Sequence, residues 1–477
     1  MFPYNQKLTE NFDLQHVPWE RMTFETGPLA WLEKSLPVLA EGFASLPPVE
    51  LCPLDQTAIL QVLEQAATRL QRNYPYFHPL YAGQMLKPPH PIARAAYMLA
   101  TWINPNNHAL DGGRASSEME TEAVRELAAM VGWNTHLGHL TSGGTFANLE
   151  ALWIAGQLAP GSVILASEQA HYTHHRIGGV LQLPFESVPA DYLGRMSLPA
   201  LEARLQRGNV STVVVTLGTT ALGAVDPLPQ VLALRDRYGF RIHVDAAYGG
   251  YFTLADNLGP DAAAACAALP RVDSLVIDPH KHGLQPYGCG CILFQDPTVG
   301  RFYKHDSPYT YFTSDELHLG EISLECSRSG AAAVALWATQ RLLPLVRNGE
   351  FAAMLQECRR AAVELHRRLR SSADFLAPLE PQLDIVVWAV RGDTVEESSA
   401  RAQAVFQAAA RNHLHLALVQ LPRKFFPADA WPRRDAGTPG PPVVTCLRSV
   451  LMKPEHRRWL DEIWDRLQSA TDQVLQA

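Results

Sequence analysis

The stretches IHVDAA (residues 242–247) and LVIDPHK (residues 275–281) decide the fold. Each begins with a short run rich in apolar, β-branched residues, which is typical of strands buried on both faces of a parallel sheet. Each run stops at a charged residue. Because the carboxyl ends of strands in such a sheet face the ligand crevice, Asp245 and Lys281 are expected to meet there.

These two residues have the chemistry that a pyridinium aldehyde requires. A buried carboxylate is costly unless it meets a cation, and the protonated ring nitrogen of pyridoxal phosphate is such a cation. A lysine amine can bind the aldehyde carbon as a Schiff base. Asp245 and Lys281 together therefore predict pyridoxal 5'-phosphate as the cofactor, whereas a lone lysine after a strand is usually a solvated surface residue.

A loop suited to the phosphate lies upstream, in LTSGGTFAN (residues 140–148). Its small residues let the backbone approach a phosphate, and Phe146, Leu149 and Trp153 continue at helical spacing, which predicts a helix after the loop. Helix N-termini bind phosphate through free N–H groups and the macrodipole. An ordinary loop before a helix is the alternative, and the order of this loop before Asp245 and Lys281 favours the phosphate.

Histidines and cysteines near these motifs raise the question of a metal site. The histidines are His171, His174, His175, His280 and His282. The spacing contains no paired-cysteine or His-Glu-x-x-His pattern, so we predict no metal and interpret His174 and His175 as polar helix or loop residues. Cys289 and Cys291 lie in an apolar stretch that is predicted to be a core strand.

Composition excludes several classes of protein. The 477 residues are 47% hydrophobic and 18% charged, which is typical of a globular chain with a sizeable core. A net charge of -8 gives no basic surface for nucleic acid or an anionic membrane. The first residues, MFPYNQ, lack a basic segment followed by an apolar stretch, and no long apolar run spans a bilayer. We therefore expect a cytoplasmic protein.

The pattern along the chain predicts an α/β protein in three parts. Residues 1–86 form an N-terminal helical segment with a helix at 56–72, and residues 87–343 alternate strand-like and helical runs. Residues 344–477 form a small C-terminal α+β domain with a helix at 351–369 and a strand at 383–390. The proline-rich stretch 421–442 is predicted to be a loop without helix or sheet pairing, and a strand follows it at 443–448.

These motifs resemble the group II pyridoxal phosphate-dependent amino acid decarboxylases of fold type I, which include the aromatic amino acid, tyrosine and glutamate decarboxylases. The matching segments are, in chain order, SGGT (142–145), EQAHY (168–172), TLGTT (216–220), HVDAAYGG (243–250), DPHK (278–281) and SRSG (327–330). The resemblance implies a large domain with a mainly parallel seven-stranded sheet flanked by helices. It also implies a homodimer, with the N-terminal segment wrapped onto the partner and active sites at the subunit interface.

The resemblance gives a role to each matching residue. Lys281 would bind the cofactor covalently, Asp245 would keep the ring nitrogen protonated, and His171 would stack on the ring and assist protonation of the substrate carbon. The other cofactor-binding positions are Ala247 under the ring, Thr220 near it, and Gly144, Thr145 and His280 at the phosphate.

The substrate is less clearly indicated. His78 and Tyr81 lie in YPYFHPLYAG (residues 74–83), which resembles the stretch that lines the substrate pocket of the family. Its aromatic residues could receive an aromatic amino acid such as tyrosine, or belong to the core or an interface. Arg114 could instead recognise an acidic substrate. Arg448 could hold a carboxylate or bind local carbonyl groups.

A loop after the cofactor lysine carries a catalytic tyrosine in several members of the family. The comparable residues here are Tyr309 and Tyr311, within 307–314, and either could protonate the carbanion. Loss of that acid diverts such enzymes toward oxidative formation of an aldehyde.

The expected reaction is the decarboxylation of an L-amino acid to the amine and carbon dioxide. The alternatives are a carbon–carbon lyase of the sphingosine phosphate lyase type, a decarboxylation-dependent aldehyde synthase, and a scaffold that binds the cofactor without turnover. The lyase would need extra cations for a second phosphate, and no added basic cluster lies near the motifs. Transamination fits the motif set less well.

Overall fold

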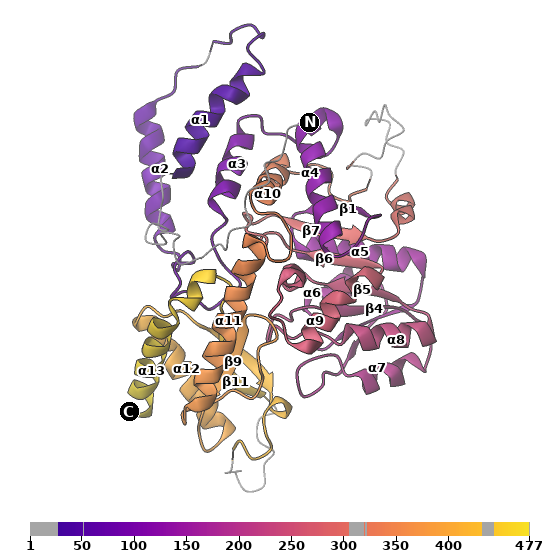
Figure 1. Cartoon of the computed structure of the whole chain (residues 1–477), viewed down its shortest axis with the longest axis vertical. Helices are drawn as coiled ribbons and strands as arrows, with labels where there is room; N and C mark the ends of the chain where they lie inside the picture. Colours follow the sequence, from indigo (N-terminus) through magenta and orange to yellow (C-terminus); the bar gives the residue numbers. More distant parts are fainter. Residues whose placement is uncertain (1–26, 51, 305–318, 320–321, 432–442, 477) are drawn as a thin grey trace.

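The computed structural model describes residues 27–50, 52–304, 319, 322–431 and 443–476. The chain forms two sheets with their flanking helices, and the N-terminal helices α1 (Gly27–Glu41) and α2 (Gln56–Leu70) stand at one side of them (Figure 1). Helix α2 begins where Asp55 caps the Ala58 N–H, close to the start that the sequence predicts. No helix of the described residues is long and apolar enough to cross a membrane.

The larger sheet has seven strands in the order β1-β7-β6-β5-β4-β2-β3. The strands are β1 (Leu137–Thr141), β2 (Val163–Ser167), β3 (Phe185–Val188), β4 (Val210–Thr216), β5 (Arg241–Asp245), β6 (Ser274–Ile277) and β7 (Gly290–Phe294). Only β7 runs antiparallel to its neighbours β1 and β6. The prediction of a mainly parallel seven-stranded sheet is therefore confirmed, as are the buried strands at 242–244 and 275–277.

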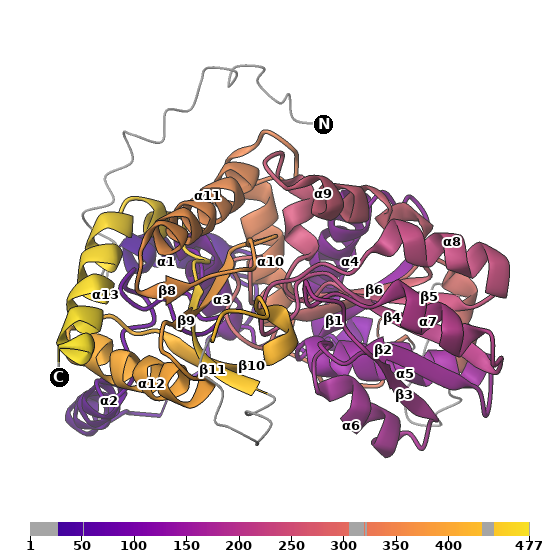
Figure 2. The ribbon, with the colours of Figure 1, turned by 90° about the horizontal axis from the view of Figure 1, so that it is seen from below.

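Helices cover both faces of this sheet (Figure 2). The helices of this part of the chain are α3 (Pro91–Thr101), which packs on α10 and α1, and α4 (Leu110–Met130), α5 (Gly144–Leu158), α6 (Thr173–Val180), α7 (Leu198–Leu205), α8 (Leu228–Tyr238), α9 (Pro260–Ala267) and α10 (Gly330–Leu342), with the 3₁₀ turns η3 (Gly250–Leu254), η4 (Leu269–Arg271) and η5 (Pro297–Phe302). Alternate strand residues face opposite cores, so Val214 packs with residues of α5 and α6 while Val213 and Val215 pack with those of α7 and α8.

The smaller sheet is antiparallel, in the order β10-β11-β9-β8. Its elements are α11 (Glu350–Ser371), β8 (Phe375–Leu376), β9 (Ile385–Val390), α12 (Val395–Arg411), β10 (Ala417–Pro422), η7 (Arg423–Phe425), β11 (Val443–Val450), η8 (Pro454–Arg457) and α13 (Leu460–Leu475). Helix α11 buries Leu355, Ala362 and Leu369 on one stripe, as its apolar spacing predicts. The predicted C-terminal α+β arrangement is confirmed.

One prediction about this sheet is wrong in part. The start of the proline-rich stretch is not a loop, because Leu421 and Pro422 pair with Val444 and Val443 of β11 and a 3₁₀ turn follows. Proline is tolerated there because β10 is an edge strand whose last residue can lack an N–H donor. Residues 432–442 lie outside the described residues.

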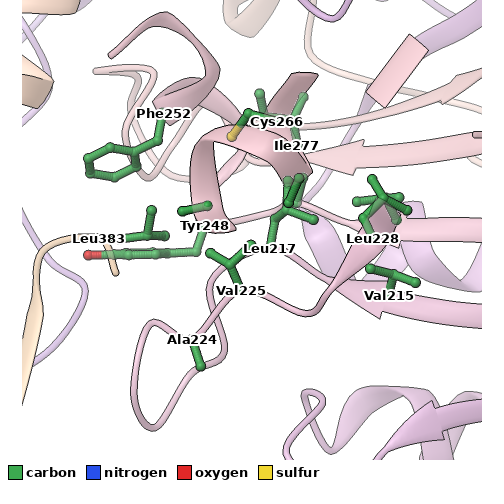
Figure 3. Close-up of a cluster of buried hydrophobic side chains, with 14 of the residues drawn as sticks. Val215, Leu217, Ala224, Val225, Leu228, Tyr248, Phe252, Cys266, Ile277 and Leu383 are labelled. Carbon is green, nitrogen blue, oxygen red and sulfur yellow. The ribbon is translucent and has the colours of Figure 1, made fainter. Parts of the chain in front are cut away.

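The hydrophobic core is continuous between the two sheets. One cluster of buried side chains includes Leu217, Val225 and Tyr248 beside the large sheet and Leu383 just before β9 (Figure 3). Ile385, the first residue of β9, belongs to the same cluster. The two sheets thus share apolar packing where they meet. The domain boundaries after residues 86 and 343 stay predictions.

Candidate active site

A cavity of about 390 Å³ opens at the carboxyl ends of the parallel strands of the large sheet. Strand ends collect functional side chains there because parallel strands all deliver their last residues to the same edge. Every residue that the sequence predicts to contact the cofactor lines this cavity: Gly144, Thr145, His171, Thr220, Asp245, Ala247, His280 and Lys281. Segments more than a hundred residues apart in the chain therefore meet at one site.

Lys281 lies in the connection between β6 and β7. Its backbone N–H donates to the Asp278 carbonyl, and its Nζ lies 3.1 Å from Asp278 Oδ2. The Lys281 side chain is 22% exposed, whereas that of Asp278 is almost fully buried. The amine is thus held at the cavity by a buried carboxylate and remains open to a ligand.

Asp245 ends β5 and receives three hydrogen bonds. His174 Nε2 lies 2.9 Å from Asp245 Oδ2, the Asn148 amide donates to the same oxygen at 3.4 Å, and the Ala247 N–H donates to Oδ1 at 3.1 Å. Burial by itself raises the pKa of Asp245. The hydrogen bond and charge of His174, together with the charge of Lys281, outweigh burial and hold that pKa below its ordinary value. Asp245 is therefore a buried carboxylate that stays ionised.

A second layer of polar side chains orients Asn148. His243 Nε2 lies 2.8 Å from Asn148 Oδ1, and His243 Nδ1 lies 2.9 Å from the Ser274 hydroxyl. Burial lowers the pKa of His243 to about 3, so the ring is neutral. An Nε2–H that donates to Asn148 then leaves Nδ1 to accept from Ser274.

His171 follows β2 and lies on the same cavity as Asp245. The Thr173 N–H donates to His171 Nδ1 at 3.3 Å, which orients the ring at the start of α6. Burial lowers the pKa of His171. The charge of Asp245 raises this pKa and the charge of Lys281 lowers it, so the net shift is downward. The imidazole is consequently neutral near pH 7.

The first turn of α5 provides an anion-binding end to the cavity. Gly143 and Gly144 bring its backbone close to the lysine loop, since a methyl group added at Gly144 would lie 2.7 Å from Asp278 Oδ2. The first N–H groups of a helix have no partner within the helix and attract a phosphate. Thr145 and His280 line the same cavity. An amine, a buried carboxylate and a helix N-terminus on one cavity fit pyridoxal 5'-phosphate.

The opposite wall is formed by the turn after β4. Gly218 has φ +95°, and an added methyl group there would lie 2.9 Å from Leu383, so only glycine suits the position. Thr220 and Tyr248 also line this wall. Leu383 lies beside the Tyr248 ring (Figure 3), so the small sheet supports the wall from behind.

The predicted substrate residues do not meet the cavity within one chain. His78 packs against Trp459, and Tyr81 forms an isolated bridge with His415. Arg114 lies on α4, with its side chain 78% exposed and 3.8 Å from Asp111. None of the three lines the cavity, because the first two face the small sheet and the third faces solvent.

Other predicted residues lie elsewhere. Tyr309 and Tyr311 lie outside the described residues. Arg448 is buried on β11, and its Nη1 donates to the Gln84 side-chain oxygen. Cys289 and Cys291 are buried at and before the start of β7, as predicted.

Sequence reasoning missed several residues of this site. His174 lies on a helix, as predicted, but it is buried against Asp245, a contact that the sequence did not indicate. His174 follows His171 by three residues, and this spacing places two side chains on the same face of a helix, so it could have indicated that both lie near the cavity. Met85, Asn148, Asp278 and Tyr248 also line the cavity. For Asn148 the signal was its position four residues into the helix that follows the glycine loop.

Fold and cavity together define the class, a fold type I enzyme that depends on pyridoxal 5'-phosphate. The family described as "Pyridoxal-dependent decarboxylase conserved domain" matches residues 52–391. The chain therefore belongs to this family, the group II pyridoxal phosphate-dependent decarboxylases, and is an amino acid decarboxylase that uses pyridoxal 5'-phosphate.

Individual relatives agree with this assignment. L-tyrosine decarboxylase of Enterococcus faecium is 26% identical over 494 residues, covering 82% of this chain and 76% of that enzyme. A probable L-tyrosine/L-aspartate decarboxylase of Methanothermobacter thermautotrophicus is 28% identical over 64% of this chain and 82% of its own length. The crystal structure of Oryza sativa TDC with PLP and tryptamine superposes with a TM-score of 0.74, at 17% identity over 94% of this chain and 99% of that one.

Proposed function

We propose that this enzyme decarboxylates an aromatic L-amino acid, with tyrosine as the first candidate, to the amine and carbon dioxide. The observation that carries the proposal is the presence of Lys281 and Asp245 on one cavity beside a helix N-terminus. The names of the relatives favour tyrosine or aspartate. Met85, Phe146 and Tyr248 give the cavity apolar and aromatic walls, and none of the described residues that line it is an arginine, which favours the aromatic substrate.

The proposed roles follow from position. Lys281 binds the cofactor aldehyde, Asp245 pairs with the ring nitrogen, and His171 covers the ring. Ala247 packs under the ring and Thr220 lies at its edge, while Gly144, Thr145 and His280 hold the phosphate. When bound, the cofactor supplies an electron sink for the electrons of the bond that breaks.

Residues of the chain also hold or transfer protons at the cavity. Lys281 Nζ is the proposed nucleophile, and Asp278 Oδ2, at 3.1 Å, positions it at the cavity. Asp245 stays ionised because the hydrogen bond and charge of His174, together with the charge of Lys281, outweigh burial, so it can keep a proton on a ring nitrogen. The neutral His171 can deliver or accept a proton at the cavity. Tyr309 and Tyr311 are the proposed acids for the substrate carbon.

We also propose a cytoplasmic homodimer. Helix α2 has no buried residue, and Leu60 and Leu63 on it are 59% and 60% exposed, which supports a partner that covers them. Arg114 is exposed and would reach a substrate only across such an interface. All seven cysteines lie in the described part of the chain and are free thiols, which supports a reducing compartment.

The test is a panel of L-amino acids, with carbon dioxide, amine, aldehyde and peroxide measured together. Equimolar amine and carbon dioxide from tyrosine support the proposal. The same products from aspartate alone would replace the aromatic substrate by an acidic one. Aldehyde with peroxide would make the enzyme an aldehyde synthase, and no product from any amino acid would favour the carbon–carbon lyase or the scaffold.

A further inference from the structure

We propose that His174 is a positioning residue that fixes Asp245 as an ionised carboxylate aimed at the ring nitrogen of the cofactor. The inference rests on the role proposed above for Asp245. It concerns a residue that lies behind the cavity wall and does not line the cavity itself.

The geometry defines what His174 can do. Its side chain is 1% exposed, and its Nε2 lies 2.9 Å from Asp245 Oδ2. A carboxylate can only accept, so the proton of this bond belongs to Nε2. His174 Nδ1 is buried without a hydrogen-bond partner in the described part of the chain. Among the described residues, the imidazole therefore hydrogen-bonds to Asp245 alone.

A second donor reaches the same carboxylate oxygen from another element. The Asn148 amide on α5 donates to Asp245 Oδ2 at 3.4 Å and to the Gly144 carbonyl at 2.8 Å. His243 in turn holds the Asn148 oxygen. Because the 3.4 Å bond is long and the His174 bond is short, His174 is the stronger of the two restraints on Oδ2.

The arrangement leaves the carboxylate charged and oriented. Oδ2 accepts from His174 and Asn148, while Oδ1 accepts only the Ala247 N–H among the described residues, and Asp245 lines the cavity. A carboxylate in this state discriminates between a protonated ring nitrogen and an uncharged atom at the same place. If His174 has only a packing role, its removal would weaken binding of any ring equally.

The experiment separates these roles with two ligands. Full-length enzyme stripped of cofactor is titrated with pyridoxal phosphate and with an analogue in which a C–H group replaces the ring nitrogen, and both dissociation constants are followed by absorbance. The dissociation constant of the analogue divided by that of pyridoxal phosphate measures how strongly the enzyme recognises the ring nitrogen. The variants are His174→Phe, which keeps an aromatic ring without a donor, His174→Leu as a second apolar variant, and His174→Gln, which restores an N–H donor.

The matched control is His175→Phe, because His175 is the next residue on the same helix and is exposed. A lost hydrogen bond to a charged group reduces the ratio about 10- to 100-fold. We expect that reduction in His174→Phe and His174→Leu, substantial recovery in His174→Gln, and the wild-type ratio in His175→Phe. A wild-type ratio in whichever apolar variant folds overturns the inference.

Asp245→Asn distinguishes this inference from the proposal on which it rests. That variant should remove the preference for the ring nitrogen altogether. If Asp245→Asn keeps the preference, the role proposed for Asp245 fails. If Asp245→Asn loses it while His174→Phe keeps it, only the inference about His174 fails. In the double variant, His174→Phe should change the ratio no further.

Discussion

The Tyr248 hydroxyl donates a 2.6 Å hydrogen bond to Asp384 Oδ1. Oδ2 of the same carboxylate lies 3.2 Å from Nε2 of His282. Tyr248 follows Ala247 and His282 follows Lys281, so one buried carboxylate ahead of β9 contacts the neighbours of two residues of the cofactor cavity. The small sheet therefore supports the positions of both cofactor loops.

The bond between Tyr248 and Asp384 should be visible in stability. We expect Tyr248→Phe and Asp384→Asn each to lower the free energy of unfolding by about 1–3 kcal/mol, because each leaves a buried polar group poorly satisfied. The double variant should cost less than the sum of the single ones, since both remove the same bond. Urea unfolding measures all four proteins, with Tyr192→Phe at an exposed position as the control. Strict additivity would contradict the coupling.

Replacement of Lys281 should remove both the covalent link and the activity. We expect Lys281→Ala to lose the visible absorption of the bound cofactor and nearly all turnover, because no other amine is placed beside Asp278 in the described cavity. Absorbance spectra and amine production are the measurements. Lys304→Ala, at an exposed lysine, should behave as wild type. Persisting turnover in Lys281→Ala would refute the assignment.

The close approach at the start of α5 predicts a specific loss of cofactor affinity. Gly144→Ala would place a methyl group 2.7 Å from Asp278 Oδ2 and push the helix end from the lysine loop. We expect the dissociation constant of pyridoxal phosphate to rise about tenfold or more, the equivalent of about 1.4 kcal/mol. Gly179→Ala is the matched control, since a methyl group there meets nothing within 4 Å. Equal affinity of the two variants would speak against the phosphate position.

Lys453 should make stability depend on pH. Its Nζ is buried and donates to the Tyr81 carbonyl, and burial lowers the pKa of Lys453 from 10.5 to about 7, with the charge of Lys87 in the same direction. Between these values the unfolded chain binds a proton that the folded chain does not. Stability attributable to this residue therefore rises with pH across that window, by at most about 1.4 kcal/mol per unit.

Lys453→Met should remove this contribution. Unfolding free energies measured from pH 7 to pH 9.5 are expected to rise less steeply with pH in the variant than in the wild type. Lys304→Met at the surface should leave the slope unchanged. An identical slope in Lys453→Met and wild type would show that the amine is charged in the fold.

The exposed apolar side chains of α2 predict the oligomeric state. We expect Leu60→Glu combined with Leu63→Glu to halve the mass measured by sedimentation, because two buried charges would disrupt a subunit interface. Gln65→Glu on the same helix tests whether added charge alone has this effect. An unchanged mass in the double variant would place the interface elsewhere.

The sequence predicted the parts of this protein that depend on local pattern. The runs at 242–244 and 275–277 have the apolar composition of strands that are buried on both faces. Asp245 and Asp278, which follow these runs, line the cavity, as the parallel pairing of the two strands requires. The glycine loop before α5 was likewise predicted from neighbouring residues in the sequence. These features needed no knowledge of distant contacts.

The residues that sequence reasoning missed depend on contacts between distant segments. His174 meets Asp245 across 71 positions, and Tyr248 meets Asp384 across 136. No periodicity records such pairs, so His174 looked like an ordinary helix residue. His78 and Tyr81 pack elsewhere within the chain and do not line its cavity. Their contact with a substrate stays a prediction, since aromatic composition does not distinguish a ligand pocket from packing against the small sheet.

The place of β1 has a consequence for biosynthesis. Within the described part of the chain this edge strand pairs only with β7, whose residues follow it by about 150 positions, with Leu137 opposite Phe294. A ribosome must therefore translate through Phe294 before the strand that carries the glycine loop has its neighbour. Nascent chains shorter than this leave β1 unpaired, and we expect them to bind pyridoxal phosphate only after β7 has been made and pairs with β1.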